Sequence, residues 1–85
     1  MAKITMADAT LDVRGLRCPL PILKAKRAIM TVPPGGLLEV LATDTGALED
    51  FQAFAAATGH GLVEYAQMNG VWRFVLRRAS GNSDR

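Results

Sequence analysis

The only cysteine in the 85-residue sequence, Cys18, lies within residues 14–21, which read RGLRCPLP. One thiol cannot close an internal disulfide, so its presence calls for another explanation. The apolar stripe that follows predicts that Cys18 stands at the start of a helix. A helix N-terminus stabilises an anion by roughly 0.3–1 kcal/mol, and by up to about 2 kcal/mol when partly buried. The position therefore predicts a nucleophilic thiol, favoured as the thiolate.

The charges near Cys18 in the sequence are all positive. Residues 14–27 contain no acid and five cations: Arg14, Arg17, Lys24, Lys26 and Arg27. Together with the helix dipole, they predict that the pKa of Cys18 falls from about 8.5 to about 7, where half of the thiol is ionised. Arg14, Arg17 and Lys24 are the candidates for stabilising the thiolate and for binding an anionic partner. The alternative, that these three side chains are merely solvated by water, is equally favoured.

Two prolines and a glycine flank this cysteine. Gly15 ends the preceding strand, Pro19 suits the first helical position, and Pro21 fits the first turn. We expect them to hold Cys18 outward on a rigid corner, which suits the transfer of a group into another protein. The alternative, a buried structural cysteine, is disfavoured by the adjacent proline and by the surrounding cations.

Residues that would complete an enzyme's active site are missing from this segment. No second cysteine is present to resolve an intermediate, and the single histidine, His60, lies far along the sequence. A minor role is conceivable for Asp44 and His60, but a helix cap for Asp44 and a turn or packing role for His60 are favoured. We expect no metal site and no turnover by this chain alone.

Six elements are expected to position these residues. The patterns predict a strand at 11–14, a helix from Cys18 to residue 32, a central strand at 37–43 and a helix that Asp44 or Thr45 caps and Gly59 ends. Asn69-Gly70 predicts a tight hairpin that closes the sheet. Its register would place Val63, Tyr65, Trp72, Phe74 and Leu76 on the core face, and Val75 with Arg73 and Arg77 on the solvated face.

The order βαβαββ predicts an α+β fold, a two-layer α/β sandwich with a four-stranded mixed sheet and two helices on one face. Residues 9–79 are expected to form the single domain, between a flexible N-terminus at 1–8 and a disordered tail at 80–85. The sequence has no signal peptide or membrane-spanning stretch, so a cytoplasmic monomer is expected. A net charge of +2 gives no general argument for binding nucleic acid or membrane.

The chain resembles the TusA (SirA-like) sulfur carriers. The resemblance rests on Leu11-Asp12-x-x-Gly15-Leu16-x-Cys18-Pro19-x-Pro21, and on Pro34-Gly35, Asp44 and Thr58-Gly59-His60. It covers roughly residues 10–78. Two positions depart from the family pattern: Thr45 replaces a frequent proline, and Ala55 replaces a second cysteine of some members.

The resemblance implies that Cys18 carries sulfur as a covalent persulfide, with no other cofactor. The donor would be a cysteine desulfurase or a rhodanese-type protein, and the acceptor a DsrE-like protein. The pathway would be tRNA thiolation, molybdenum-cofactor maturation or sulfur oxidation. Two alternatives stay open: a non-catalytic regulatory or interaction module that uses its basic face, and a thiol redox sensor that dimerises through Cys18.

Overall fold

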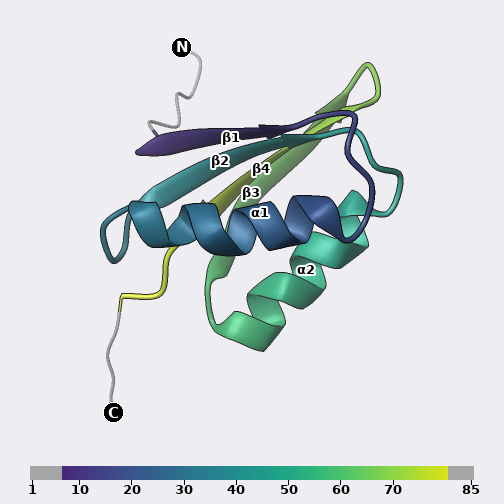
Figure 1. The fold of residues 1–85 in the computed structure, drawn as a ribbon. Coiled ribbons are helices and arrows are strands. Elements are labelled where there is room, and N and C mark those ends of the chain that lie inside the picture. The colour runs from purple at the N-terminus through teal and green to yellow at the C-terminus, as the bar shows by residue number, and fades with distance from the viewer. Residues whose placement is uncertain (1–6, 81–85) are drawn as a thin grey trace.

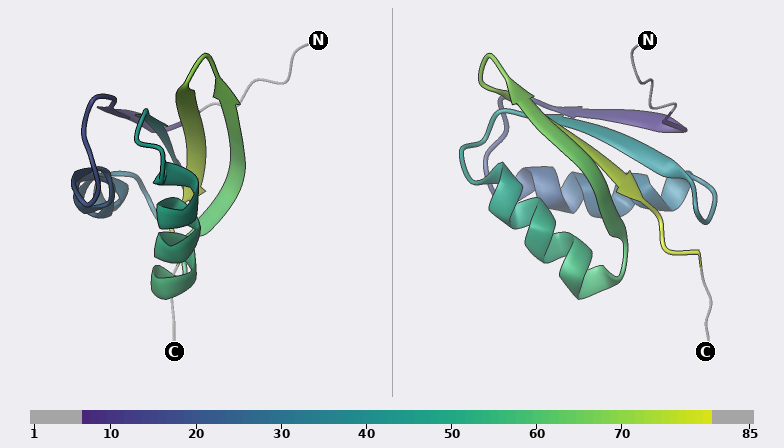
Figure 2. Two further views of the ribbon diagram at one scale, coloured as in Figure 1. Left: turned by 90° about the vertical axis from the view of Figure 1, so that its right-hand side faces the viewer. Right: turned by 180° about the vertical axis from the view of Figure 1, so that it is seen from behind.

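The computed structural model describes residues 7–80, and it confirms the α+β sandwich and the order βαβαββ. The elements are β1 (Ala9–Val13), α1 (Leu20–Ala28), a 3-10 turn η1 (Ile29–Thr31), β2 (Leu37–Ala42), α2 (Ala47–Thr58), β3 (Gly61–Met68) and β4 (Val71–Arg77). The strands lie in the order β1-β2-β4-β3, with β1 parallel to β2 and the other pairs antiparallel. Both helices cover one face of the sheet, and no helix of residues 7–80 lies on the other face (Figures 1 and 2).

The core lies between the helices and the sheet. Alternate residues of β2 are buried, namely Leu38, Val40 and Ala42. From α1 and η1, Ala25 and Ile29 meet them. The ring of Phe51 on α2 stacks on that of Phe74 on β4, with centroids 4.7 Å apart. Burial of these apolar faces drives the two layers together.

The hairpin forms at Asn69-Gly70 as predicted, with φ values of 53° and 81°. Its predicted register is wrong beyond Glu64, because a β-bulge at Val63 brings Leu62 opposite Leu76. Leu62 therefore packs against the core, and Val63 is 47% exposed. The extra residue in one strand reverses which side chains face inward.

Two further predictions need correction. Val75 was expected on a solvated face but is fully buried, on the sheet face opposite the helices. Asp8 was expected in a loose terminus, yet its backbone N–H donates to the Leu37 carbonyl and its carboxylate accepts from the Leu37 N–H, both at 2.8 Å. The flexibility predicted for residues 1–6 and 81–85 lies outside the described residues.

The parallel pairing of β1 and β2 determines where the candidate site forms. Parallel neighbours end at the same edge of the sheet, so the chain leaves both strands side by side. The β1–α1 connection, which contains Cys18, therefore meets the β2–α2 connection, which contains Asp44 (Figure 1). The first turns of α1 and α2 are brought together at this edge.

Candidate functional site

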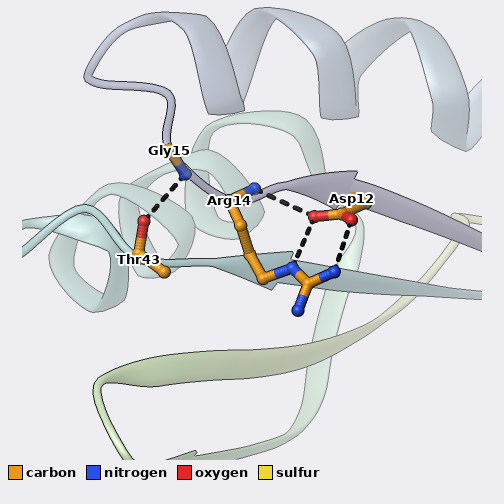
Figure 3. Close-up of polar contacts among 4 residues, drawn as sticks. All are labelled: Asp12, Arg14, Gly15 and Thr43. Atoms are coloured by element: carbon orange, nitrogen blue, oxygen red, sulfur yellow. Dashed lines mark hydrogen bonds and ion pairs between the residues drawn. The ribbon is translucent and has the colours of Figure 1, made fainter.

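The connection from β1 to α1 (residues 14–19, the Cys18 corner) is held to its neighbours at several points. Gly15 has a φ of 84°, a left-handed conformation that glycine adopts without strain. Its N–H donates to the Thr43 hydroxyl at 2.9 Å, which ties the turn to the end of β2 (Figure 3). The Leu16 N–H donates to the Val13 carbonyl at 3.2 Å, and the Leu16 side chain packs against the core. The corner is thus anchored before it reaches the cysteine.

Cys18 itself is exposed, and the chain beyond it is anchored again. Pro19 is the N-cap of α1, one position earlier than the first helical position predicted for it. The Leu20 N–H donates to the Arg17 carbonyl at 2.8 Å, and the Leu23 N–H donates to the Pro19 carbonyl at 3.0 Å. Pro21 is buried against the core. The sulfur therefore stands at the surface between two fixed points.

An open groove runs beside Cys18 between α1 and α2. Its wall is mainly apolar; the lining residues are Cys18, Pro19, Ile22, Leu23, Lys26, Asp50, Ala53, Phe54, Ala57 and Thr58. On the other side of the corner lies a more polar hollow, formed by Gly15, Leu16, Arg17, Thr43, Asp44 and Thr45. Cys18 is thus accessible to a partner that contacts apolar surface with one part and polar groups with another.

The predicted fall in the pKa of Cys18 is wrong, because the structure raises it. The largest cause is a side-chain hydrogen bond with Asp50, followed by partial loss of solvent and by the charges of Asp50 and Asp44. Both acids disfavour the thiolate. The prediction failed because it counted charges near in sequence, whereas Asp50 arrives by the packing of α2 beside α1.

The predicted cations do not act as a group. Arg14 folds back onto Asp12, with Nε–Oδ1 and Nη2–Oδ2 distances of 2.9 and 2.8 Å (Figure 3). This pairing lowers the pKa of Asp12 to about 2 and raises that of Arg14. Arg17 and Lys24 are exposed, and neither forms an ion pair with a described residue. Of the three cations, these two remain available to a partner.

The two lesser candidates, Asp44 and His60, both make local contacts. The Asp44 carboxylate accepts from the Gly46 N–H at 3.2 Å, and Gly46, rather than Asp44 or Thr45, is the N-cap of α2. The Nδ1 atom of His60 accepts from the Ala79 N–H at 2.8 Å. The pKa of His60 is lowered by partial burial, and less by Arg78. His60 lies outside the groove that Cys18 lines.

Sequence reasoning missed Asp50 and the apolar wall of the groove. A signal was present: β1 and β2 were both expected to feed a helix, and a parallel pair places the two helix starts together. Asp50 lies in the first turn of α2. Its charge should therefore have been included in the prediction of the Cys18 pKa. Within residues 7–80, no cluster of three or more acidic, histidine or cysteine side chains could hold a metal ion. No helix in that range has the length and apolar character needed to cross a bilayer.

Comparisons with known proteins cover nearly all of the described chain. Residues 9–78 match the family model described as sulfurtransferase TusA. A putative sulfur carrier protein of Neisseria meningitidis serogroup A is 50% identical over 72 residues, which span 85% of this chain and 97% of that protein. The sulfur carrier protein TusA of Allochromatium vinosum is 43% identical, over 85% and 95%. A crystal structure of a SirA-like protein from Desulfitobacterium hafniense superposes with a TM-score of 0.72 at 27% identity, over 84% and 97%.

Proposed function

Because this chain belongs to the TusA family of sulfur carriers, we propose that Cys18 receives a sulfane sulfur as a persulfide and delivers it to a second protein. The observation that carries the proposal is an exposed thiol on an anchored corner. The corner positions the sulfur but offers no second described cysteine to capture it. Such a site receives its sulfur from one partner protein and passes it to another.

The transfer requires only thiol–persulfide exchange. The Cys18 thiolate attacks the outer sulfur of a donor persulfide, a new sulfur–sulfur bond forms, and the donor's own sulfur–sulfur bond breaks. The electron pair of the broken bond stays on the donor sulfur, which leaves as a thiolate, and the proton of the Cys18 thiol passes to solvent. No net oxidation occurs. Delivery repeats these steps with an acceptor thiolate attacking the persulfide on Cys18.

The surface around Cys18 suits contact with another protein. Leu20 and Leu23 are 46% and 54% exposed beside the thiol, and Arg17 and Lys24 flank them. Apolar side chains ringed by charge are typical of transient interfaces. We assign the donor to the cysteine desulfurase or rhodanese type and the acceptor to the DsrE-like type, in the cytoplasm. The pathway is tRNA thiolation, molybdenum-cofactor maturation or sulfur oxidation.

The test is sulfur loading followed by intact-mass measurement. Incubation with a cysteine desulfurase and cysteine should add one sulfur atom to the wild-type chain, and a reductant should remove it. Cys18→Ser should show no gain at all. Because Cys18 is exposed, the same substitution should leave the stability within about 0.5 kcal/mol.

A wild-type chain that takes up no labile sulfur from a desulfurase, a rhodanese or polysulfide would refute the carrier function. Full biological activity of Cys18→Ser, together with loss on reversing Arg17 and Lys24, would instead establish the interaction module. Dimers linked through Cys18 under mild oxidant would point to the redox sensor.

A further inference from the structure

We propose that Asp50 restrains the Cys18 thiol in the free carrier, and that a cationic group of the docked partner neutralises Asp50 and so releases the thiolate. This inference rests on the carrier function proposed above and adds a positioning residue to it. Asp50 is 32 positions away in the sequence and reaches Cys18 because α1 and α2 begin at the same edge of the sheet.

The two side chains share one surface groove. Both line the groove between α1 and α2, and Asp50, as a hydrogen-bond acceptor, is the largest cause that raises the pKa of the Cys18 thiol. A thiol can donate to a carboxylate, whereas a thiolate can only be repelled by it. The pair therefore favours the protonated and unreactive form of Cys18, since only the thiolate attacks sulfur.

Other charges around Cys18 leave this restraint in place. Asp44, in the β2–α2 connection, adds repulsion of the thiolate from a second direction. Lys26 of α1 lines the same groove, and Arg17 precedes Cys18 in the chain. Neither cation forms an ion pair with Asp50 or with any other described residue. The carboxylate is left for an incoming cation.

The expected sequence of events follows from these contacts. In the free carrier Asp50 favours the protonated thiol over the thiolate, and the thiol is the form less prone to oxidation. A partner that places an Arg or Lys side chain against Asp50 withdraws the acceptor from the thiol and cancels the nearby negative charge. The Cys18 proton then passes to solvent, and the thiolate attacks the donor persulfide. Loading is thereby confined to the docked complex.

The first experiment measures the restraint without any sulfur. The rate of Cys18 alkylation by iodoacetamide is followed against pH in wild type, Asp50→Asn and Glu49→Gln. Asp50→Asn should move the profile to lower pH and raise the rate at pH 7 by several-fold, up to about tenfold for a shift of one pH unit. Glu49→Gln removes the neighbouring acid of the same helix turn, so it reproduces any general loss of helix charge and should leave the profile unchanged.

An unchanged profile in Asp50→Asn overturns the restraint, and so does an equal shift in both variants. Circular dichroism and thermal unfolding establish that the variants are folded. Asp50→Glu, which keeps the charge, should return the profile toward wild type if the longer side chain still reaches the sulfur. This experiment stands whether or not Cys18 carries sulfur, so its failure and the failure of the carrier function are distinguishable.

The second experiment tests the neutralisation. Inorganic polysulfide offers sulfur but no cation, whereas a cysteine desulfurase with cysteine offers sulfur from a protein surface. Asp50→Asn should load several-fold faster than wild type from polysulfide, and should gain nothing, or lose rate, with the desulfurase. An equal acceleration with both donors would show that the docked protein leaves Asp50 charged, and would overturn this half of the proposal.

Discussion

The helix-free face of the sheet and the Cys18 corner differ in whether their charged side chains form ion pairs. On the helix-free face Arg73 donates from Nε to Glu39 and from Nη1 to Glu64, the latter at 3.1 Å. The Thr10 hydroxyl donates to Glu39 at 2.9 Å. Beneath this network lies Val75, fully buried on that face. Each of these charged groups meets an opposite charge.

Near Cys18, most charged side chains lack an ion-pair partner among the described residues. Arg17, Lys24 and Asp50 form no ion pair with a described residue, and Asp50 lines the same groove as Cys18. Neutralised charges hold strands together, whereas exposed unpaired charges contribute little to stability and remain free to bind. Charges that look alike in the sequence are therefore paired on one face and left without an ion pair among the described residues near Cys18.

The largest effect is expected on the helix-free face. Arg73→Ala leaves Glu39 and Glu64, both partly buried, facing each other across Val75 without their shared cation. Loss of the charge-assisted hydrogen bonds from Arg73 to these two carboxylates costs about 1–3 kcal/mol. Urea unfolding at pH 7 measures the change. Alkylation of Cys18 should be unaffected.

Arg17→Ala is the matched control, because it removes an exposed arginine without an ion pair among the described residues. Its stability should stay within about 0.5 kcal/mol of wild type. If both substitutions cost the same, the division between the two regions is wrong. Glu39→Gln combined with Arg73→Ala should recover part of the loss, because one unpaired charge is then gone.

The next effect concerns the corner. Reversing Arg17 and Lys24 to glutamate should slow sulfur loading from a protein donor by on the order of tenfold, with stability nearly unchanged. The loss should shrink as salt is added, since exposed charges are screened. Loading rates from a desulfurase at two ionic strengths measure it.

The control for this pair is Arg77→Glu, which reverses an exposed arginine at the end of β4. It changes the net charge with the same sign but away from the thiol, and should leave loading close to wild type. Arg17→Glu alone changes the net charge by the same amount as Arg77→Glu, so equal slowing by these two single variants would mean that only the total charge matters. No slowing by the double reversal would mean that the corner cations are merely solvated.

The sequence predicted much of the fold because local patterns determine it. The central strand at 37–43, the helix that Gly59 ends and the Asn69-Gly70 turn were each indicated by a short local pattern. The failures concern non-local choices. A bulge at Val63 follows from how β3 fits beside β4, and no short pattern encodes it. The burial of Val75 depends on side chains from the neighbouring strands.

The candidate site divides in the same way. The exposure of Cys18 followed from its place at a proline-bounded helix start, which is a local feature. The direction of its pKa shift could not be predicted from neighbours in the sequence, because Asp50 approaches from α2. Arg14 shows the same limit: it follows β1 by one residue, yet its guanidinium pairs with Asp12 rather than approaching the thiol.

The smallest effect is expected at this Asp12–Arg14 pair, where the two regions meet. The pair lowers the pKa of Asp12 from 3.8 to about 2. A carboxyl whose pKa is lower in the folded state stabilises the fold above the pKa of the unfolded chain, and this contribution is lost as the pH falls from about 4 to about 2. Asp12→Asn should therefore be slightly less stable than wild type at pH 7, and most of this difference should be gone at pH 2.

Both groups of this pair are 52% exposed, so solvent and salt weaken the pair and the difference should be small. The amide oxygen that Asp12→Asn introduces can still accept the Arg14 backbone N–H, so the turn is kept and only the charge is removed. Urea midpoints at pH 7 and pH 2 measure the difference, and the other carboxylates cancel because both proteins share them.

Asp12→Asn also frees the Arg14 guanidinium from its carboxylate partner. If the freed guanidinium moved toward Cys18, the thiol would be alkylated faster at pH 7. That result would show that the Asp12 carboxylate is what keeps Arg14 away from the thiol. An unchanged alkylation rate would mean that the backbone turn alone directs Arg14 away from the thiol.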